Sequence, residues 1–355
     1  MDCHRSCSRP IWERIALVVS MLLVVGNGQA RTWHVPAECP TIHAGLDSAS
    51  YGDTVLVAPG TYLETDDPET RIDPGPGVCL TSEAGPELTI VEFCNTTPGI
   101  GLGTVISCEG ARVSGLTIRF GSGPDCHYPP APTNGIFCWN CTDVMVENCI
   151  IEHVSYGIYV EGSSSEWWEP VFRNNIIRNC AFGIACYGVL DPGRPFFQSN
   201  IVTECNYGTR IMESAPIFQG NEITHCRDYG MYFSGNCAGG CDRNTIAHNE
   251  RTGVYIYADP PLGAPSFNGG FKPENANDFY DNGGYDIWYN HSSAGNVLAQ
   301  YNYWGGDCPD FSSRIRGNVW YSPWVDATHT RILNEDDCQG ATDRSTWGSI
   351  KAMYK

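Results

Sequence analysis

The sequence predicts an all-β solenoid built from stacked coils of about 21–27 residues. A motif recurs between residues 148 and 253: an asparagine, an apolar residue two places later, and a glycine eight or nine places after the asparagine. Short runs rich in β-branched and aromatic residues lie between these marks and favour strands, and no stretch has the periodicity of a helix. A single coil cannot bury its apolar face alone, so the coils must stack.

The repeat aligns into columns, because equivalent residues of stacked coils lie above one another. The asparagine column is Asn148, Asn175, Asn200, Asn221 and Asn244. The apolar column is Ile150, Ile177, Val202, Ile223 and Ile246, and the glycine column is Gly157, Gly183, Gly208, Gly230 and Gly253. A carboxamide both donates and accepts, so we expect the asparagines to form a buried hydrogen-bonded ladder. The alternative is that they are solvated turn residues.

The first thirty residues are typical of an export signal. Three arginines, Arg5, Arg9 and Arg14, precede an apolar run from Ile15 to Val25, and the segment ends in Gly28-Gln29-Ala30. We therefore expect residues 1–30 to be a cleaved signal peptide and the protein to be secreted or extracytoplasmic, in the periplasm, at the cell surface or outside the cell. The run is too short to span a bilayer and no later apolar segment reaches about 18 residues, so no membrane span is expected; an uncleaved anchor is the alternative.

The charge balance narrows the range of partners. The chain has 40 acidic and 21 basic residues, for a formal net charge of −19. Such a surface lacks the basic patch that phosphate backbones require, which excludes nucleic acid as a partner. The sequence does not indicate an oligomeric state.

On these motifs the sequence resembles the right-handed parallel β-helix repeat proteins of pectin-lyase-like fold, of the exported bacterial type. Residues 41–64 are similar to the segment with which the family caps its first coil, GLTIRFG from Gly115 is similar to an early coil, and NYWGGDCP from Asn302 with VWYSPW from Val319 is similar to a closing module.

The resemblance implies a domain organisation. It predicts a β-helix over residues 31–330, with a short capping helix at its N-terminal end that sets Ala44, Leu46 and Ala49 against the first coil. Residues 331–355 are expected to be a polar C-terminal tail, in which Ser345 begins a second short capping helix.

Function has to be argued from a site, because this fold carries lyases, hydrolases, esterases, epimerases and non-catalytic proteins. The family's catalytic signatures QDT, DFIFG, GRPW, GHG and RIK are missing. Lyase chemistry needs a base, and of the three lysines only Lys272 lies in a suitable loop. The favoured interpretation is a non-catalytic protein that binds carbohydrate or a surface partner. The alternative is a lyase or epimerase that acts on uronate polymers.

The strongest site candidate is an outward column two places after each glycine. It contains Tyr159, Arg210, Tyr232 and Tyr255, and Trp167 and Trp168 in a nearby turn would extend it. Planar side chains on a flat ridge suit stacking on sugar faces, which predicts a polysaccharide or cell-surface glycan as ligand. The structural alternative is that the rings only stack on one another.

A second candidate is an outward polar ladder with Glu152, Glu204, His225 and His248. Adjacent coils would bring these groups close enough for a carboxylate-oriented histidine or a weak metal site, and a solvated face is the alternative. The sequence predicts no metal site and no cofactor, and leaves weak Ca²⁺ binding open.

The chain has 18 cysteines, which suits an oxidising compartment. Cys180, Cys205 and Cys226 share one column whose side chains point the same way, so we expect small buried thiols there. The expected disulfides are Cys237 with Cys241 and Cys308 with Cys338, although sequence alone does not fix the pairing.

Overall fold

The computed structural model describes residues 29–338 except for 66–71, 95–103, 108–109, 122–132, 140, 142–143, 163–168, 190–193, 258–264 and 291–294. The predicted signal peptide up to residue 28, and the predicted C-terminal helix from Ser345, lie outside the described residues.

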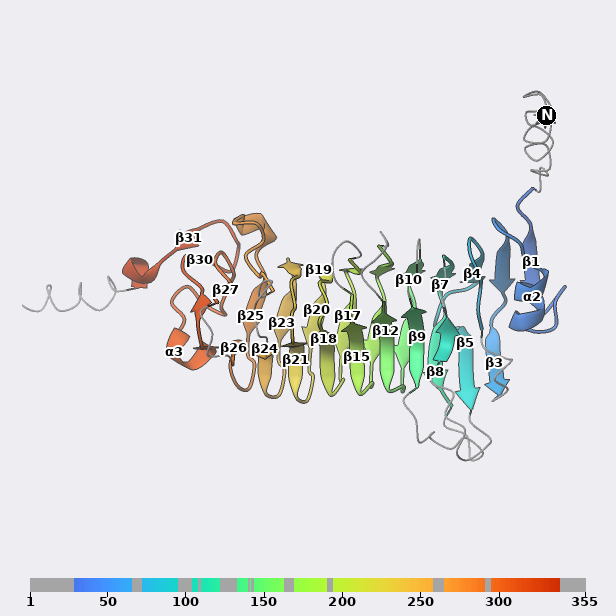
Figure 1. The fold of residues 1–355 in the computed structure, drawn as a ribbon, viewed down its shortest axis with the longest axis horizontal. Coiled ribbons are helices and arrows are strands. Elements are labelled where there is room, and N and C mark those ends of the chain that lie inside the picture. The colour runs from blue at the N-terminus through green and yellow to red at the C-terminus, as the bar shows by residue number, and fades with distance from the viewer. Residues whose placement is uncertain are drawn as a thin grey trace, which may run out of the picture.

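Three parallel sheets of nine strands each run along the molecule, and every full coil contributes one strand to each sheet in turn (Figure 1). Sheet A consists of β1 (Thr32–Val35), β2 (Thr54–Val57), β4 (Cys79–Ser82), β7 (Arg112–Ser114), β10 (Met145–Glu147), β13 (Val171–Arg173), β16 (Phe196–Gln198), β19 (Ile217–Gln219) and β22 (Gly240–Asp242). Sheet B consists of β3 (Gly60–Thr65), β5 (Thr89–Cys94), β8 (Thr117–Phe120), β11 (Ile150–Glu152), β14 (Ile176–Arg178), β17 (Ile201–Thr203), β20 (Glu222–Thr224), β23 (Thr245–Ala247) and β25 (Asp278–Tyr280). Sheet C consists of β6 (Thr104–Ser107), β9 (Asn134–Trp139), β12 (Tyr156–Glu161), β15 (Phe182–Tyr187), β18 (Tyr207–Met212), β21 (Tyr229–Ser234), β24 (Thr252–Tyr257), β26 (Ile287–Tyr289) and β28 (Ile315–Arg316).

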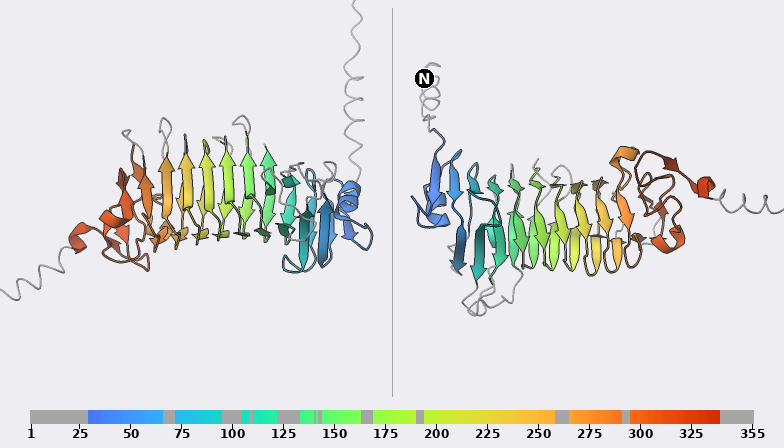
Figure 2. Two further views of the ribbon diagram at one scale, coloured as in Figure 1. Left: turned by 90° about the horizontal axis from the view of Figure 1, so that it is seen from below. Right: turned by 180° about the vertical axis from the view of Figure 1, so that it is seen from behind.

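The two further views show the strands of the sheets as parallel rows along the long axis, which confirms the predicted parallel β-helix (Figure 2). The core lies between the sheets, where inward side chains of successive coils stack. In sheet A, for example, the ring centroids of Phe172 and Phe197 are 5.0 Å apart, and those of Phe197 and Phe218 are also 5.0 Å apart. These three rings are fully buried. Period-two alternation in each strand therefore builds a continuous core from short segments.

A buried asparagine ladder runs at the corner between sheets A and B. The Nδ2 group of Asn175 donates to Oδ1 of Asn200 (3.0 Å), Asn200 donates to Asn221 (2.9 Å) and Asn221 donates to Asn244 (2.9 Å). The ladder continues through Asn277 and Asn302, which the sequence repeat did not identify. Each Oδ1 also accepts the backbone N–H of the preceding coil's ladder residue, so the buried amides satisfy one another.

The assignment of Asn148 to this ladder is wrong. Asn148 is an exposed turn residue with φ of 55°, and Cys149 occupies the ladder position, where its N–H donates to Oδ1 of Asn175 (3.0 Å). The register of this coil is therefore shifted by one, and Ile151 rather than Ile150 pairs with Ile177. The neighbouring turns place Asn174 and Ser199 in the same left-handed conformation. In this coil the asparagine that the motif identified, Asn148, is thus a turn residue one place before the ladder position.

A second ladder lies at the corner between sheets B and C, and thiols form its first part. Cys180, Cys205 and Cys226 are buried and form no disulfide, and Asn249 follows them, as predicted for small buried residues in one column. Asn249 donates to Oδ1 of Asn282 (3.0 Å). Burial raises the pKa of Cys180 and of Cys226 well above the usual range, so these thiols stay protonated.

The glycine column is explained by the close approach of neighbouring backbone and side-chain atoms to these residues at this corner. A Cβ on Gly208 would overlap the carbonyl oxygen of Gly230 and the Cγ2 atom of Ile223. A Cβ on Gly230 would lie 2.7 Å from Nδ2 of Asn249. Each glycine therefore gives room to the ladder residue of the next coil.

Both ends of the β-helix are covered. The capping helix α2 (Ile42–Ser48) begins at Thr41, whose Oγ1 accepts from the N–H of Ala44 (3.1 Å). Ala44, Leu46 and Ala49 pack against the core as predicted, but the most buried contacts come from Ile42 and Gly45. No helix among the described residues is long and apolar enough to cross a bilayer.

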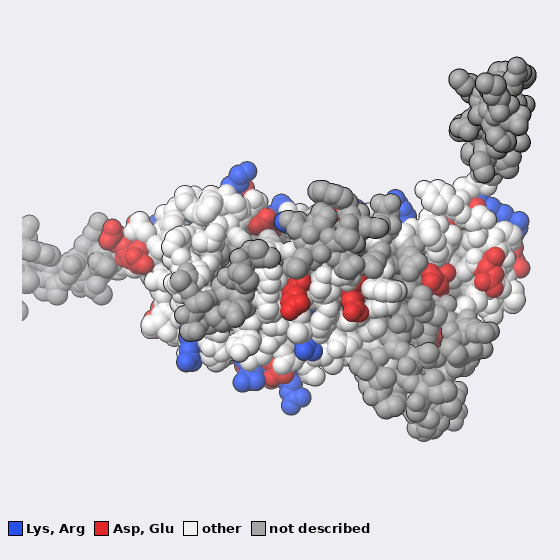
Figure 3. Space-filling model, viewed as in Figure 1, with Lys and Arg blue, Asp and Glu red and all other residues white. Residues whose placement is uncertain are grey.

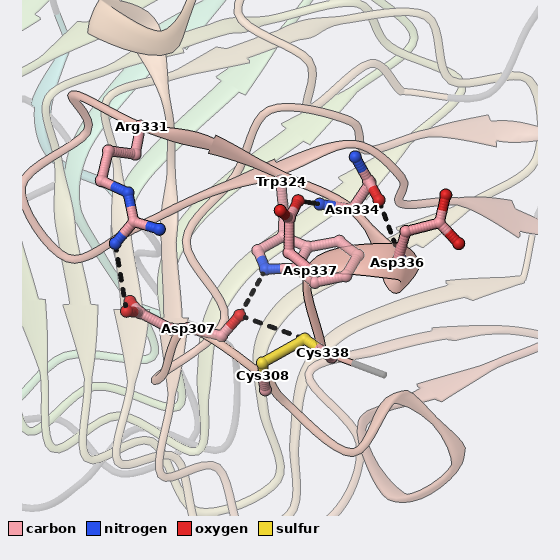
Figure 4. The surroundings of a disulfide bond; sticks show 8 residues. All are labelled: Asp307, Cys308, Trp324, Arg331, Asn334, Asp336, Asp337 and Cys338. Atoms are coloured by element: carbon pink, nitrogen blue, oxygen red, sulfur yellow. Dashed lines mark hydrogen bonds and ion pairs between the residues drawn. A yellow bond between two sulfur atoms is a disulfide. The ribbon is translucent and has the colours of Figure 1, made fainter. Parts of the chain in front are cut away.

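At the other end lie the remaining short elements, which are η1 (Pro273–Asn275), β27 (Val297–Leu298), α3 (Phe311–Arg314), β29 (Val319–Trp320), β30 (Trp324–Val325) and β31 (Ile332–Leu333). Strand β31 pairs antiparallel with β30, and Leu333 is buried. The predicted disulfide between Cys308 and Cys338 is present beside Trp324, whose Nε1 donates to the carbonyl oxygen of Asp307 (3.0 Å) (Figure 4). The closing module therefore extends beyond the predicted boundary at residue 330, to Cys338.

The other predicted disulfide is wrong, because Cys237 and Cys241 are both buried free thiols. Cys241 lies in β22 at the position that pairs with Phe218, and so follows the inward column of sheet A. The thiol of Cys237 instead donates to the carbonyl oxygen of Ser234 (3.0 Å). Closeness in sequence across a glycine-rich turn was not sufficient, since strand geometry fixes the side-chain direction.

The ladder predicts that Asn221→Asp destabilises the protein by about 3 kcal/mol at neutral pH. The substitution keeps the shape but removes the two hydrogen bonds that Nδ2 donates to Phe197 O and Asn244 Oδ1. Burial raises the pKa of the new carboxyl group in the folded state, so the loss should shrink as the pH falls from that raised pKa toward the unfolded-state pKa of about 4. Urea unfolding followed by circular dichroism measures both effects. Asn148→Asp is the control and should change stability by less than about 0.5 kcal/mol; equal losses in both variants would contradict the shifted register.

The second ladder predicts that Cys226→Asn is tolerated within about 1 kcal/mol. The amide would lie against Gly208 as Asn249 lies against Gly230, and it would donate to Oδ1 of Asn249. Cys226→Leu should cost about 2 kcal/mol, because the larger apolar side chain cannot fit there. The denaturant midpoints of the two variants measure this difference in stability. An asparagine variant that is less stable than the leucine variant would contradict this description of the corner.

Candidate functional site: the aromatic face of sheet C

Sheet C has the widest outer surface of the three sheets. Its central strands are six residues long, whereas the matching strands of sheets A and B have three. In β12 the first, fourth and sixth residues, Tyr156, Tyr159 and Glu161, point outward, while Ile158 and Val160 are fully buried. The same alternation in the neighbouring strands produces three outward columns, which we call the aromatic face.

The predicted column lies in the fourth position of these strands. The structure aligns Phe137, Tyr159, Ala185, Arg210, Tyr232 and Tyr255 in consecutive register and continues them with Trp288 and Arg316. Tyr159, Arg210, Tyr232 and Tyr255 are all partly exposed, whereas Ala185 is buried beneath its neighbours. Trp167 and Trp168 lie outside the described residues.

A second aromatic column, at the first position of the strands, was not identified from the sequence. It contains Tyr156, Phe182, Tyr207 and Tyr229, each immediately before a glycine of the glycine column. Their successive ring centroids are 4.9, 5.2 and 5.6 Å apart. The recurring aromatic-glycine pair was the signal that would have revealed it. The sixth position adds Trp139 and Tyr257, which are 58% and 56% exposed.

The rings of this face pack on one another and are also open to solvent. Tyr232 and Tyr255 stack with centroids 5.7 Å apart and planes 18° apart, and Phe137 stacks on Tyr159 at 5.4 Å. The hydroxyl groups of Tyr207, Tyr229 and Tyr232 form no hydrogen bond with any described residue, so they remain available to a ligand. The face therefore combines planar apolar surface with unused polar groups.

Burial affects the ionisation of four tyrosines of this face. Burial raises the pKa of Tyr159, and the hydrogen bond from its hydroxyl to Glu161 Oε2 (3.0 Å) raises it further. Burial likewise raises the pKa of Tyr187, Tyr207 and Tyr229. These groups therefore act as neutral hydrogen-bond donors and acceptors at any physiological pH.

Charge does not accumulate into one broad acidic surface on the side of the molecule that Figure 3 shows. Acidic and basic side chains stand in small separate groups there, with uncharged surface between them. On the aromatic face itself, Arg251 pairs with Asp228 (3.3 Å) and lies over the Tyr229 ring. The overall charge of the chain is therefore a poor guide to the charge that a ligand meets locally.

The predicted polar ladder is correct in part. Glu204, His225 and His248 share one exposed left-handed turn position between sheets B and C, together with His153, Asn179 and Asp281. The His225 and His248 rings stack at 5.4 Å, and His248 Nδ1 lies 3.9 Å from Asp281 Oδ2.

Glu152 does not belong to this ladder, because the register of its coil is shifted by one residue, as described above for Asn148. It is 7% exposed, and its carboxylate pairs with Arg178 (2.8 Å) and Arg119 (3.7 Å) on the outer surface of sheet B. Arg119 pairs in turn with Glu92 (3.0 Å). Glu152 is therefore part of an alternating ion-pair ladder that joins four coils.

Two family descriptions match the chain. The description "right handed beta helix region" matches residues 134–302, and "periplasmic copper-binding protein (NosD)" matches residues 46–191. A comparison with curated protein sequences gives no match.

Solved structures of several β-helix proteins are similar to this chain. The Dettilon tailspike protein has a TM-score of 0.56 and 13% identity, over 83% of this chain and 62% of that one. The A-module of the Azotobacter vinelandii mannuronan C-5 epimerase AlgE6 has a TM-score of 0.53 and 15% identity, over 78% and 74%. The A-module of AlgE4 from the same organism has 0.50 and 14%, over 70% and 69%. At these identities the similarity shows the fold alone.

The described residues do not fit a copper site. No three His, Cys, Asp or Glu side chains among them lie together as metal ligands would. His225 and His248 stack face to face, and the Cys180 and Cys226 thiols are buried and protonated. One matching family is described as copper-binding, but the part of the chain that the structure describes offers no group of side chains that could bind copper together.

Sequence repeat, sheet topology and structural similarity agree. This chain is a right-handed parallel β-helix repeat protein of the pectin-lyase-like fold.

Proposed function

We propose that this is an extracytoplasmic protein that binds a polysaccharide along the aromatic face of sheet C. The observation that carries the proposal is the pair of adjacent columns along the axis of the β-helix: the fourth-position column extends from Phe137 in β9 to Trp288 in β26, and the first-position aromatic column lies beside it from β12 to β21. A polysaccharide repeats its sugar units along the chain, as this face repeats its rings from coil to coil. One extended polysaccharide chain can therefore contact equivalent rings on successive coils. Aromatic planes offer sugar rings an apolar contact, and free hydroxyls offer hydrogen bonds at their edges.

The competing explanation is that the rings serve stability alone. Stacked cross-strand aromatic pairs do stabilise sheets, by about 0.5–1 kcal/mol each. Stability alone, however, does not favour leaving Trp139 and Tyr257 more than half exposed. It also gives no role to the unbonded hydroxyls of Tyr207, Tyr229 and Tyr232. The binding function accounts for both features.

Three observations support an extracytoplasmic location. The first thirty residues are typical of an export signal, and one matching family is described as periplasmic. The disulfide between Cys308 and Cys338 is also expected in an oxidising compartment.

A polysaccharide-active enzyme is the second candidate. Two similar structures are A-modules of mannuronan C-5 epimerases, and among the described residues of this chain His329 Nε2 lies 2.7 Å from Asp278 Oδ1, beside Tyr303. That pair lies at β25 in sheet B, away from the aromatic face. Incubation with uronate polymers, with ultraviolet detection of unsaturated product and NMR detection of epimerised residues, tests this candidate; sustained turnover would replace the binding proposal.

The proposal predicts that Tyr232→Ala combined with Tyr255→Ala weakens polysaccharide binding at least tenfold, because about 1.4 kcal/mol or more of stacking energy is lost. Affinity electrophoresis in gels that contain a panel of polysaccharides, followed by calorimetry on the best one, measures the effect. Tyr51→Ala is the control, since Tyr51 is 86% exposed and lies beside Gly77, far from this face. Circular dichroism checks folding, and unchanged affinity in a folded double variant would reject this site.

A further inference from the structure

Two arginines on the aromatic face have no carboxylate partner. The side chains of Arg210 in β18 and Arg316 in β28 form no ion pair or hydrogen bond with any described residue, although acidic residues outnumber basic ones in the chain. Other partly buried arginines are paired: Arg119 with Glu92, Arg178 with Glu152 and Arg314 with Asp286. Arg210 is half-buried and differs in this respect from those three, whereas Arg316 is exposed to solvent.

Aromatic rings hold both guanidinium groups in place. The Cζ atom of Arg210 lies 5.0 Å from the Phe182 ring centroid and 5.6 Å from that of Tyr187. The Cζ atom of Arg316 lies 4.7 Å from the Trp288 ring and 5.6 Å from the Tyr285 ring. Cation–π contact fixes the position of a guanidinium group and leaves its N–H edges unused. Those edges are suited to bidentate hydrogen bonding with an oxyanion.

The two arginines stand at the ends of one row of rings. In the register of sheet C, Arg210 is followed by Tyr232, Tyr255, Trp288 and then Arg316. Four strand steps separate the two arginines, which corresponds to about 19 Å. Two acids beside this row are paired with other arginines, Asp228 with Arg251 and Asp286 with Arg314 (2.7 Å). The row itself therefore has two positive charges and no acidic side chain, in a protein that is acidic overall.

We propose that the polysaccharide is anionic and that Arg210 and Arg316 bind its carboxylate or sulfate groups while the rings between them carry the sugars. This inference rests on the proposed function and adds the chemical class of the ligand. A neutral glycan would leave two desolvated guanidinium groups without a partner, which costs binding energy. A polyanion gives each of them an oxyanion and gains the ring contacts as well.

Matched pairs of polymers test the ligand class. Polygalacturonate is compared with its fully methyl-esterified form, and dextran sulfate with dextran, so that each pair differs only in charge. We expect the wild-type protein to bind at least one anionic member at least tenfold more tightly than its neutral counterpart, and the pair that shows the preference identifies carboxylate or sulfate as the recognised group.

Variants then test the two arginines. Arg210→Gln with Arg316→Gln should bring the affinity for the anionic polymer down to that for the neutral one. Arg243→Gln, which removes an exposed charge from the turn between β22 and β23, should leave the preference unchanged. Circular dichroism verifies that the variants fold, and Arg210→Lys with Arg316→Lys, which retains charge without the planar fork, should keep only part of the preference.

The outcomes separate this inference from the proposed function. If the wild-type protein binds neutral and anionic polymers equally, or if the folded glutamine variant keeps its preference, the anionic ligand is rejected and polysaccharide binding stands. If no polymer binds and the Tyr232 and Tyr255 substitutions have no effect, the proposed function itself fails.

Discussion

The relay of buried amide hydrogen bonds at the corner between sheets A and B fixes the register of the coils on which the surface depends. Each ladder carboxamide from Asn175 to Asn277 donates to the next coil and accepts from the previous one, and Asn302 ends the ladder as an acceptor. A slip of one residue would bury an unsatisfied amide and would turn inward side chains outward. A local polar interaction thus determines which residues of every coil face solvent.

The aromatic face follows from this register and from strand length. Six-residue strands turn three residues per coil outward, and the ladder holds those residues in line from coil to coil, so that Tyr232 meets Tyr255 and Tyr255 meets Trp288. The glycine column lets the second ladder approach the strand backbone from inside, as Asn249 does at Gly230. The face is therefore supported by a rigid scaffold, and a binding surface on such a scaffold loses little conformational entropy when ligand binds.

The fold and the predicted aromatic column could be derived from the sequence because both depend on periodicity. Asn148 and Glu152 were misplaced because the asparagine of that coil falls in the turn and Cys149 fills the ladder, a substitution that a pattern based on asparagine cannot detect. The bridge between Cys237 and Cys241 failed because strand geometry, not sequence distance, sets side-chain direction. Arg210 was recognised as part of the ridge, but its lack of a carboxylate partner is a three-dimensional property that no spacing reveals.

The acidity of the whole chain does not argue against an anionic ligand. At physiological ionic strength exposed charges are screened over about 8 Å, so a bound polymer responds to the charges of the strands it touches. Along the row from Arg210 to Arg316 the only charged members are those two arginines, and the neighbouring acids Asp228 and Asp286 are paired with other arginines. The remaining negative charge slows the approach of a polyanion mainly at low ionic strength, and raising the salt concentration reduces that effect. Local pairing of charges rather than their sum decides which polymer this surface can hold.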